Sequence, residues 1–206
     1  MSLRFYRFAK VVCNVVCKLW FKLEYYGMEN LPKDRGYILV GNHQSYWDPV
    51  MMGLKLDTTL TFMANEKLFH KPVLAPVIRG LGAFPVNLKK PDMTAIRTAK
   101  KVVKDGKVLA LFPEGTRSHD GKLLKFKGGV IYIASVTGED VVPVCITYQN
   151  GGKFRSRILI RYGEVIPNRE ILEGKKKDTE SMRQAAAKLQ AVVQRLQDEN
   201  LAVMGK

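Results

Sequence analysis

The chain has 206 residues, and 46% of them are hydrophobic, which allows one domain with a full core and excludes disorder as the default. The formal net charge of +15 favours nucleic acid, anionic lipid or an acidic protein as partner, without choosing among them. The three cysteines form no Cys-x2-Cys pair and look like small buried or membrane-facing apolar residues, which predicts a reducing compartment. The three histidines are scattered and lack the spacing of zinc ligands, so we expect no metal site.

The N-terminal segment is apolar apart from polar residues three or four positions apart, which would form one narrow helical stripe: Arg4, Arg7, Lys10, Asn14, Lys18 and Lys22. We expect residues 1–26 to form a basic amphipathic helix in the membrane interface. Docking of this helix on the domain is the alternative. The uninterrupted apolar length is far below the roughly 20 residues of a spanning helix, so we expect peripheral or monotopic attachment.

Strands and helices alternate through residues 27–206, which predicts a single α/β domain. The expected strands cover 37–40, 60–64, 83–86, 108–112, 141–148 and 154–162, and the expected helices cover 49–54, 71–81, 93–105, 128–136 and 179–196. Basic residues at 155, 157 and 161 suggest that strand 154–162 lies at an edge. The prediction is a layered sandwich with a central mixed sheet flanked by helices.

His43 and Asp48 lie in a short segment directly after the expected strand 37–40. Asp48 followed by Pro49 is typical of a helix start, with Asp48 as N-cap. A loop that folds back would bring the carboxylate to the imidazole and leave the other ring nitrogen as a base for a hydroxyl. Taken alone, a purely structural pair is an equal alternative.

A second segment, Phe112 to Ser118, follows the expected strand 108–112 and should lie at the same edge of the sheet as His43. Glu114 and Arg117 in it could also form a surface ion pair of little energetic value. Further along, Lys127 and Gly128 precede an expected helix whose first amides could hold an anion, or which is an ordinary glycine-rich helix entry.

Four blocks together resemble the glycerolipid acyltransferase family, and within it the bacterial 1-acyl-sn-glycerol-3-phosphate acyltransferases. They are His43-x4-Asp48, Gly82 to Asn87 with Phe84 and Pro85, Phe112-Pro113-Glu114-Gly115-Thr116-Arg117-Ser118, and Val142-Pro143-Val144. Their order and spacing fit over about residues 37–147. One departure is Leu88, where the family usually carries an arginine; Lys89 and Lys90 follow it.

The resemblance implies acyl transfer from acyl-CoA or acyl carrier protein to the sn-2 hydroxyl of lysophosphatidic acid, giving phosphatidic acid without a cofactor. It places the protein at the cytoplasmic face of the membrane, with an anionic membrane surface as partner. Another lysolipid or glycerol 3-phosphate is the alternative acceptor, and a basic binding module without catalysis is the alternative class. No recognised nucleic-acid motif supports the latter.

The resemblance also implies roles for individual residues. His43 and Asp48 are the catalytic candidates, and the candidates for the acceptor phosphate are Arg117, Glu114, Gly115, Thr116, Lys89 and Lys90. Lys127 and Gly128 are candidate contacts for an anion or the donor. The structural members of the motifs are Phe84, Pro85, Pro113 and Pro143.

Overall fold

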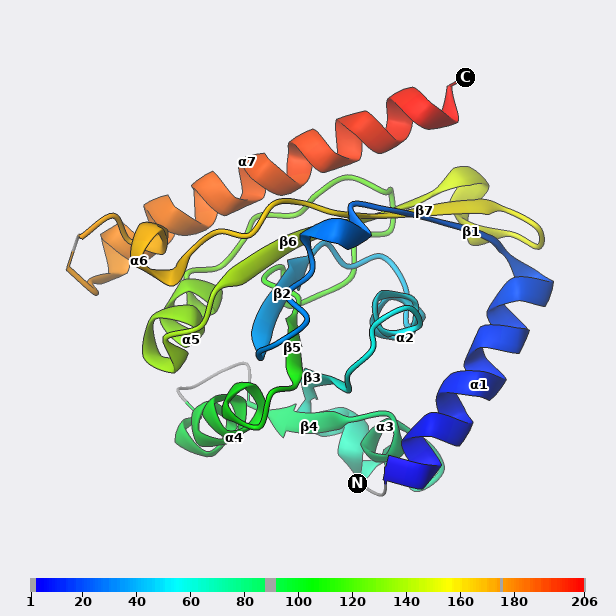
Figure 1. Cartoon of the computed structure of the whole chain (residues 1–206), viewed down its shortest axis with the longest axis horizontal. Helices are drawn as coiled ribbons and strands as arrows, with labels where there is room; N and C mark the ends of the chain where they lie inside the picture. The colour runs from blue at the N-terminus through cyan, green and yellow to red at the C-terminus, as the bar shows by residue number, and fades with distance from the viewer. Residues whose placement is uncertain (1–2, 88–91, 175, 206) are drawn as a thin grey trace.

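The computed structural model describes residues 3–87, 92–174 and 176–205, and Leu88, Lys89 and Lys90 lie outside them (Figure 1). A seven-stranded sheet forms its centre, in the order β1-β7-β6-β2-β5-β3-β4. The strands are β1 (Lys22–Tyr26), β2 (Tyr37–Gly41), β3 (Leu60–Asn65), β4 (Ala83–Val86), β5 (Val108–Leu111), β6 (Val141–Tyr148) and β7 (Arg157–Tyr162). All neighbours are parallel except β6 and β7, so the predicted mixed sheet is confirmed.

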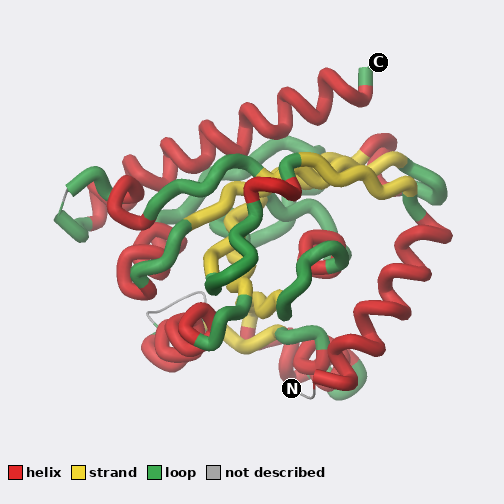
Figure 2. The backbone as a smooth tube through the Cα atoms, viewed as in Figure 1, coloured by secondary structure: helices red, strands yellow, loops and turns green. Residues whose placement is uncertain are grey.

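Helices cover both faces of the sheet, as Figure 2 shows. They are α1 (Leu3–Trp20), α2 (Asp48–Gly53), α3 (Leu74–Gly80), α4 (Met93–Lys104), α5 (Gly129–Thr137), α6 (Asn168–Ile171) and α7 (Thr179–Met204), with 3-10 turns η1 (Met28–Asn30), η2 (Glu66–His70) and η3 (Gln149–Gly152). Strand β2 is buried on both faces, because Tyr37 and Leu39 join the core under α1 and α2 while Ile38 and Val40 join the core under α4, α5 and α7.

The predicted helix 1–26 is wrong in its extent. The helix ends at Trp20, and Lys22–Tyr26 forms β1, which pairs in parallel with β7 from Lys22↔Arg157 to Tyr26↔Arg161. An ion pair between Arg157 Nε and Glu24 Oε1 at 2.7 Å supports this pairing. β7 is therefore an interior strand rather than the expected edge, since β1 covers it.

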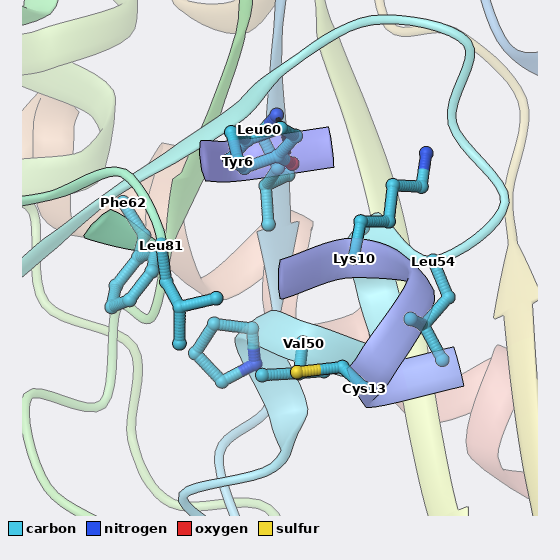
Figure 3. A pocket seen from close by; sticks show the side chains of 10 residues that line it. Tyr6, Lys10, Cys13, Val50, Leu54, Leu60, Phe62 and Leu81 are labelled. Carbon is cyan, nitrogen blue, oxygen red and sulfur yellow. Dashed lines mark hydrogen bonds between the residues drawn. The ribbon is translucent and has the colours of Figure 1, made fainter. Parts of the chain in front are cut away.

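One face of α1 packs on the domain. The Tyr6 hydroxyl accepts a hydrogen bond from Leu60 N at 3.0 Å, and Lys10, expected on the polar stripe, donates from Nζ to Leu56 O. A small cavity of about 30 Å³ lies between this face and α2, lined by Cys13 and Val50 among others (Figure 3). The predicted docking alternative is thus part of the structure.

The opposite face of α1 is left uncovered. Its exposed apolar residues are Phe5, Phe8, Val11, Val12, Val15, Val16 and Leu19, and Leu3 and Trp20 are exposed at the two ends of the helix. In the part of the chain that the structure describes, none of the helices combines the length and apolarity needed to cross a membrane.

Candidate active site

The end of β2 fixes where the candidate catalytic loop begins. Val40 lies between Leu111 of β5 and Pro143 of β6. Beyond it, the buried Asn42 donates from Nδ2 to Ile146 O at 2.9 Å and accepts from Ile146 N at 2.8 Å through Oδ1. This side chain continues the β2–β6 pairing, so His43 leaves the sheet in a defined direction.

His43 and Asp48 form the predicted pair, with His43 Nδ1 at 2.8 Å from Asp48 Oδ2. Asp48 is fully buried, whereas the His43 side chain is 18% exposed. When Nδ1–H donates to the carboxylate, Nε2 keeps a free lone pair and can act as a base. The loop thus positions one buried carboxylate behind one reachable imidazole.

The expected N-cap role of Asp48 is wrong. Trp47 occupies the cap position of α2, and Asp48 is its first residue, with Pro49 next. Its carboxylate turns back to the loop, where Oδ2 accepts from Gln44 N at 2.7 Å and Ser45 N at 2.8 Å. Trp47 has no side-chain acceptor, so the start of α2 has no side-chain cap, and the carboxylate of Asp48 serves His43 and these two amides instead.

The segment after β5 meets the His43 loop directly. The Phe112 ring stacks on the His43 ring, with centroids 4.2 Å apart and planes at 25°. Ser118 N donates to His43 O at 2.8 Å, and His43 N donates to Glu114 Oε1 at 3.3 Å. The two segments expected to share one sheet edge therefore lie in contact.

Glu114 is buried beside this loop, with 2% exposure, and no ion pair joins it to Arg117 among the described residues. Burial raises the pKa of Glu114 to about 7, the negative charge of Asp48 adds to the rise, and the peptide N–H groups of His43 and Leu124 oppose it. Its second oxygen, Oε2, has no hydrogen-bond partner among the described residues. The alternative of a surface Glu114–Arg117 ion pair is excluded.

Arg117 is half-buried, and its guanidinium carbon lies 3.8 Å from the ring centroid of Tyr46. Thr116, next to it, is exposed. The structure leaves the fork of Arg117 free of any ion pair with a described carboxylate. A stacked, partly exposed arginine of this kind can hold a phosphate.

Lys127 lies against the same loop, and Gly128 follows it at the start of α5. Lys127 N donates to Pro113 O at 3.0 Å, and a Cβ on Gly115 (φ +71°) would lie 2.6 Å from Lys127 Nζ. Gly128 caps α5 without a side-chain hydrogen bond. The structure therefore brings Lys127 together with Gly115, whereas Gly128 lies against Met182 of α7. Lys89 and Lys90 lie outside the described residues.

The remaining motif residues have structural positions. Pro85 is exposed on the edge strand β4, where its missing N–H costs no ladder bond, and Phe84 packs against a core cluster. Pro113 is buried under the loop. Pro143 is buried in β6, one residue before the pairing with β7 begins at Val144↔Tyr162.

Two aromatic residues of the site were missed by the sequence reasoning. Tyr148, the last residue of β6, donates from its hydroxyl to Asp48 Oδ1 at 2.5 Å, and Tyr46 stacks on Arg117. A signal for Tyr148 did exist, since the predicted strand 141–148 ends at the same edge as His43 when the two strands are parallel.

Among the described residues, no group of three or more His, Cys, Asp or Glu side chains could hold a metal ion. The chemistry that the geometry offers is proton removal by His43 beside a cationic, stacked Arg117.

Comparison with known proteins agrees with this geometry. The family model described as Acyltransferase matches residues 22–147. A 1-acyl-sn-glycerol-3-phosphate acyltransferase of Streptococcus pneumoniae is 32% identical over 194 residues, covering 90% of this chain and 71% of that protein. A 1-acyl-sn-glycerol-3-phosphate acyltransferase of Bacillus subtilis is 28% identical over 149 residues, covering 72% of this chain and 74% of that protein.

A crystal structure gives the same result for the fold. The 1-acyl-sn-glycerophosphate acyltransferase PlsC from Thermotoga maritima superposes with a TM-score of 0.68 and 29% identity, covering 95% of this chain and 78% of that one. With the family model matching more than half of its length, this chain belongs to the acyltransferase family.

Proposed function

We propose that this enzyme transfers an acyl chain to the sn-2 hydroxyl of lysophosphatidic acid and so forms phosphatidic acid for phospholipid biosynthesis. The observation that carries the proposal is the His43–Asp48 pair at 2.8 Å, in contact with the loop that presents Arg117. The names of the relatives point to the same acceptor.

In the proposed mechanism, His43 Nε2 takes the proton of the acceptor hydroxyl while Asp48 stabilises the resulting imidazolium. The alkoxide attacks the carbonyl carbon of an acyl thioester, and collapse of the tetrahedral intermediate releases the thiolate, which takes the proton from His43. The acceptor attacks directly, so no enzyme nucleophile is needed. Burial raises the pKa of Cys17 to about 11 and that of Cys145 to about 12, which makes both poor nucleophiles.

The acceptor phosphate would lie at the loop after β5. Arg117 offers a planar fork for two phosphate oxygens, and Lys127 adds a positive charge beside Gly115. In this proposal Glu114 braces the loop through His43 N, and Thr116, Gly128, Lys89 and Lys90 are further phosphate or donor contacts. The donor would be acyl-CoA or acyl carrier protein, and no bound cofactor takes part.

The exposed apolar face of α1 would lie in the cytoplasmic face of the membrane, where the acceptor resides. Arg4, Arg7 and Lys18 on this helix are exposed and would meet lipid phosphates. Phe154, 62% exposed, extends the face by an edge contact with Trp20 at 5.2 Å between centroids. Three unpaired cysteines suit the reducing cytoplasm.

The test is acyl transfer from labelled acyl-CoA, and separately from acyl carrier protein, to lysophosphatidic acid in mixed micelles. We expect phosphatidic acid from the wild type and a loss on the order of a hundredfold or more in His43→Ala. His70→Ala, which removes an exposed histidine, serves as the matched control and should keep full activity. Retained turnover in His43→Ala would exclude the base role.

The choice of acceptor is tested in the same assay. If another lysolipid or glycerol 3-phosphate is acylated and lysophosphatidic acid is not, the proposed acceptor is wrong but the proposed acyl transfer stands. A folded protein that acylates none of them would overturn the proposal.

A further inference from the structure

The carboxylate of Asp48 is held from two sides. Oδ2 accepts from the His43 loop, through the ring of His43 at 2.8 Å and two amides. Oδ1 accepts from the Tyr148 hydroxyl at 2.5 Å, a donor that belongs to a distant strand. Because Asp48 is fully buried, the loss of this donor would leave Oδ1 without a hydrogen bond from water or a described residue.

The sheet explains how Tyr148 reaches this position. β6 is parallel to β2, with Gly41 opposite Val144, so β6 continues past the point where β2 ends. Ile146, which bonds Asn42, and Tyr148 are two residues apart and therefore project from the same face of the strand, toward α2. β6 therefore both anchors the His43 loop through Ile146 and places Tyr148 beside Asp48.

The surroundings keep the phenol protonated and its ring in place. Burial raises the pKa of Tyr148, and the charge of Asp48 and the hydrogen bond to it raise it further. Gly152 (φ +76°) lies beside the ring, and a Cβ there would approach Tyr148 Cδ1 to 3.0 Å. The hydroxyl is thus a fixed donor rather than a group that titrates near neutral pH.

We propose that Tyr148 is a positioning residue for the acyl transfer, which holds Asp48 Oδ1 so that Oδ2 stays directed at His43 Nδ1. This inference rests on the proposed function. Without the phenol, the buried Oδ1 has no partner among the described residues and the carboxylate is held on its Oδ2 side alone, so the orientation of the imidazole, and with it the direction in which Nε2 faces the acceptor hydroxyl, is less well fixed.

The first experiment compares Tyr148→Phe with Tyr25→Phe. Tyr25 donates to Met51 O at 3.1 Å, so both variants remove a partly buried phenol hydroxyl from the surroundings of α2, but only one of these hydroxyls touches Asp48. We expect Tyr148→Phe to lower kcat about tenfold with the KM for lysophosphatidic acid within about twofold, and Tyr25→Phe to keep the kcat of the wild type. The melting temperature of each variant reports its folding.

A double-mutant cycle with Asp48→Asn tests whether Tyr148 acts through Asp48. If it does, Tyr148→Phe should have no further effect on kcat in the Asp48→Asn background. The same tenfold loss in both backgrounds would overturn the inference, and so would equal kcat losses in Tyr148→Phe and Tyr25→Phe.

A second pair of variants keeps the test decisive if Tyr148→Phe fails to fold. Gly151 (φ +66°) and Gly152 (φ +76°) share the left-handed backbone, but a Cβ on Gly151 meets nothing within 4 Å. Gly152→Ala should therefore lower kcat more than Gly151→Ala, because it alone displaces the Tyr148 ring. Equal values would argue against the inference.

The two proposals fail in different ways. An inactive wild type contradicts the proposed function. An active wild type with an inactive His43→Ala variant and an unaffected Tyr148→Phe variant contradicts only the role of Tyr148.

Discussion

Arg117 shows how a single residue can be prepared for its ligand. A surface arginine normally samples many rotamers, yet the guanidinium of Arg117 lies 3.8 Å from the Tyr46 ring centroid. Stacking orients the plane of the fork while leaving its edge N–H groups available. Lysine cannot reproduce this arrangement, because its ammonium is a point charge without a plane.

Arg117→Lys should therefore weaken acceptor binding more than chemistry. We expect the KM for lysophosphatidic acid to rise about tenfold while kcat changes by less than about threefold. Arg35→Lys is the control. Arg35 pairs with Asp140 at 2.8 Å and lies just before β2, at the end of this strand that is opposite to His43. A fall in kcat at constant KM would contradict a role in binding the phosphate.

Glu114 should make the stability of the protein depend on pH. The pKa of this carboxyl rises from 4.5 to about 7 on folding, mainly through burial. Between these values the folded state binds more protons, so the stabilising contribution is complete below about pH 4.5 and is lost as the pH rises through about 7. The difference amounts to about 3 kcal/mol at most.

Glu114→Gln stays neutral and should lack this dependence. Urea unfolding between pH 4.5 and pH 8 should show the wild type losing stability relative to the variant as the pH rises. Glu29→Gln, at an exposed glutamate, should follow the wild-type profile. Parallel profiles for wild type and Glu114→Gln would show that the carboxyl does not titrate in this window.

Residue patterns predicted the His43–Asp48 pair because both partners lie in one short loop. They failed on the orientation of Asp48, whose carboxylate serves the loop amides and His43 instead of capping α2. They placed Tyr148 at the end of a predicted strand but did not predict its contact with Asp48, since that contact depends on the parallel pairing of β2 with β6 and on how far β6 extends past β2.

At the scale of elements, one strand accounts for two errors in the predicted fold, the extent of the N-terminal helix and the place of β7 at an edge. Lys22 continues the three-to-four spacing of the basic residues, so residues 22–26 fit a helix as well as a strand. Residues 22–26 form a strand because they pair with β7, more than a hundred residues away, and because Glu24 forms an ion pair with Arg157. The local spacing of residues gives no information about this pairing or this ion pair. The strands around the site could be predicted because each of them is a run of buried, apolar residues.

The turn after β1 offers a test of this arrangement. Gly27 (φ +70°) ends the strand so close to β7 that a Cβ would lie 2.0 Å from Tyr162 O. Gly138 (φ +79°) has the same left-handed backbone, but a Cβ there meets nothing within 4 Å. Comparing alanine substitutions at Gly27 and Gly138 therefore separates the cost of left-handed backbone from the cost of a steric clash with β7.

Gly138→Ala should cost about 1 kcal/mol of unfolding free energy, the penalty for left-handed backbone alone. Gly27→Ala should cost at least about 2 kcal/mol more, because the β1–β7 edge has to open. Urea denaturation of both variants measures the difference. Equal losses would mean that the turn can move away from β7 at no cost.

At the scale of the whole molecule, the uncovered face of α1 and the catalytic loop belong to one side of the architecture. Phe21, just after α1, makes an edge contact with Trp47, next to Asp48, at 6.5 Å between centroids. The inward face of α1 packs along α2 and the small cavity beside it (Figure 3). A lipid surface that covers α1 would therefore lie near the loop that receives the acceptor.

This arrangement predicts that membrane binding and catalysis can be separated by substitution. Phe8 and Leu19, each 67% exposed, are eleven residues apart and share one face of α1. Phe8→Ser with Leu19→Ser removes two large apolar side chains from the proposed interface and should lower partition onto anionic phosphatidylglycerol vesicles at least tenfold. Acyl transfer to lysophosphatidic acid in those vesicles should fall in parallel, while transfer to a short-chain, water-soluble analogue should not change. Leu201→Ser, at a 51% exposed position on α7, should alter neither. Vesicle binding that survives the double substitution would show that another surface of this +15 chain meets the lipid.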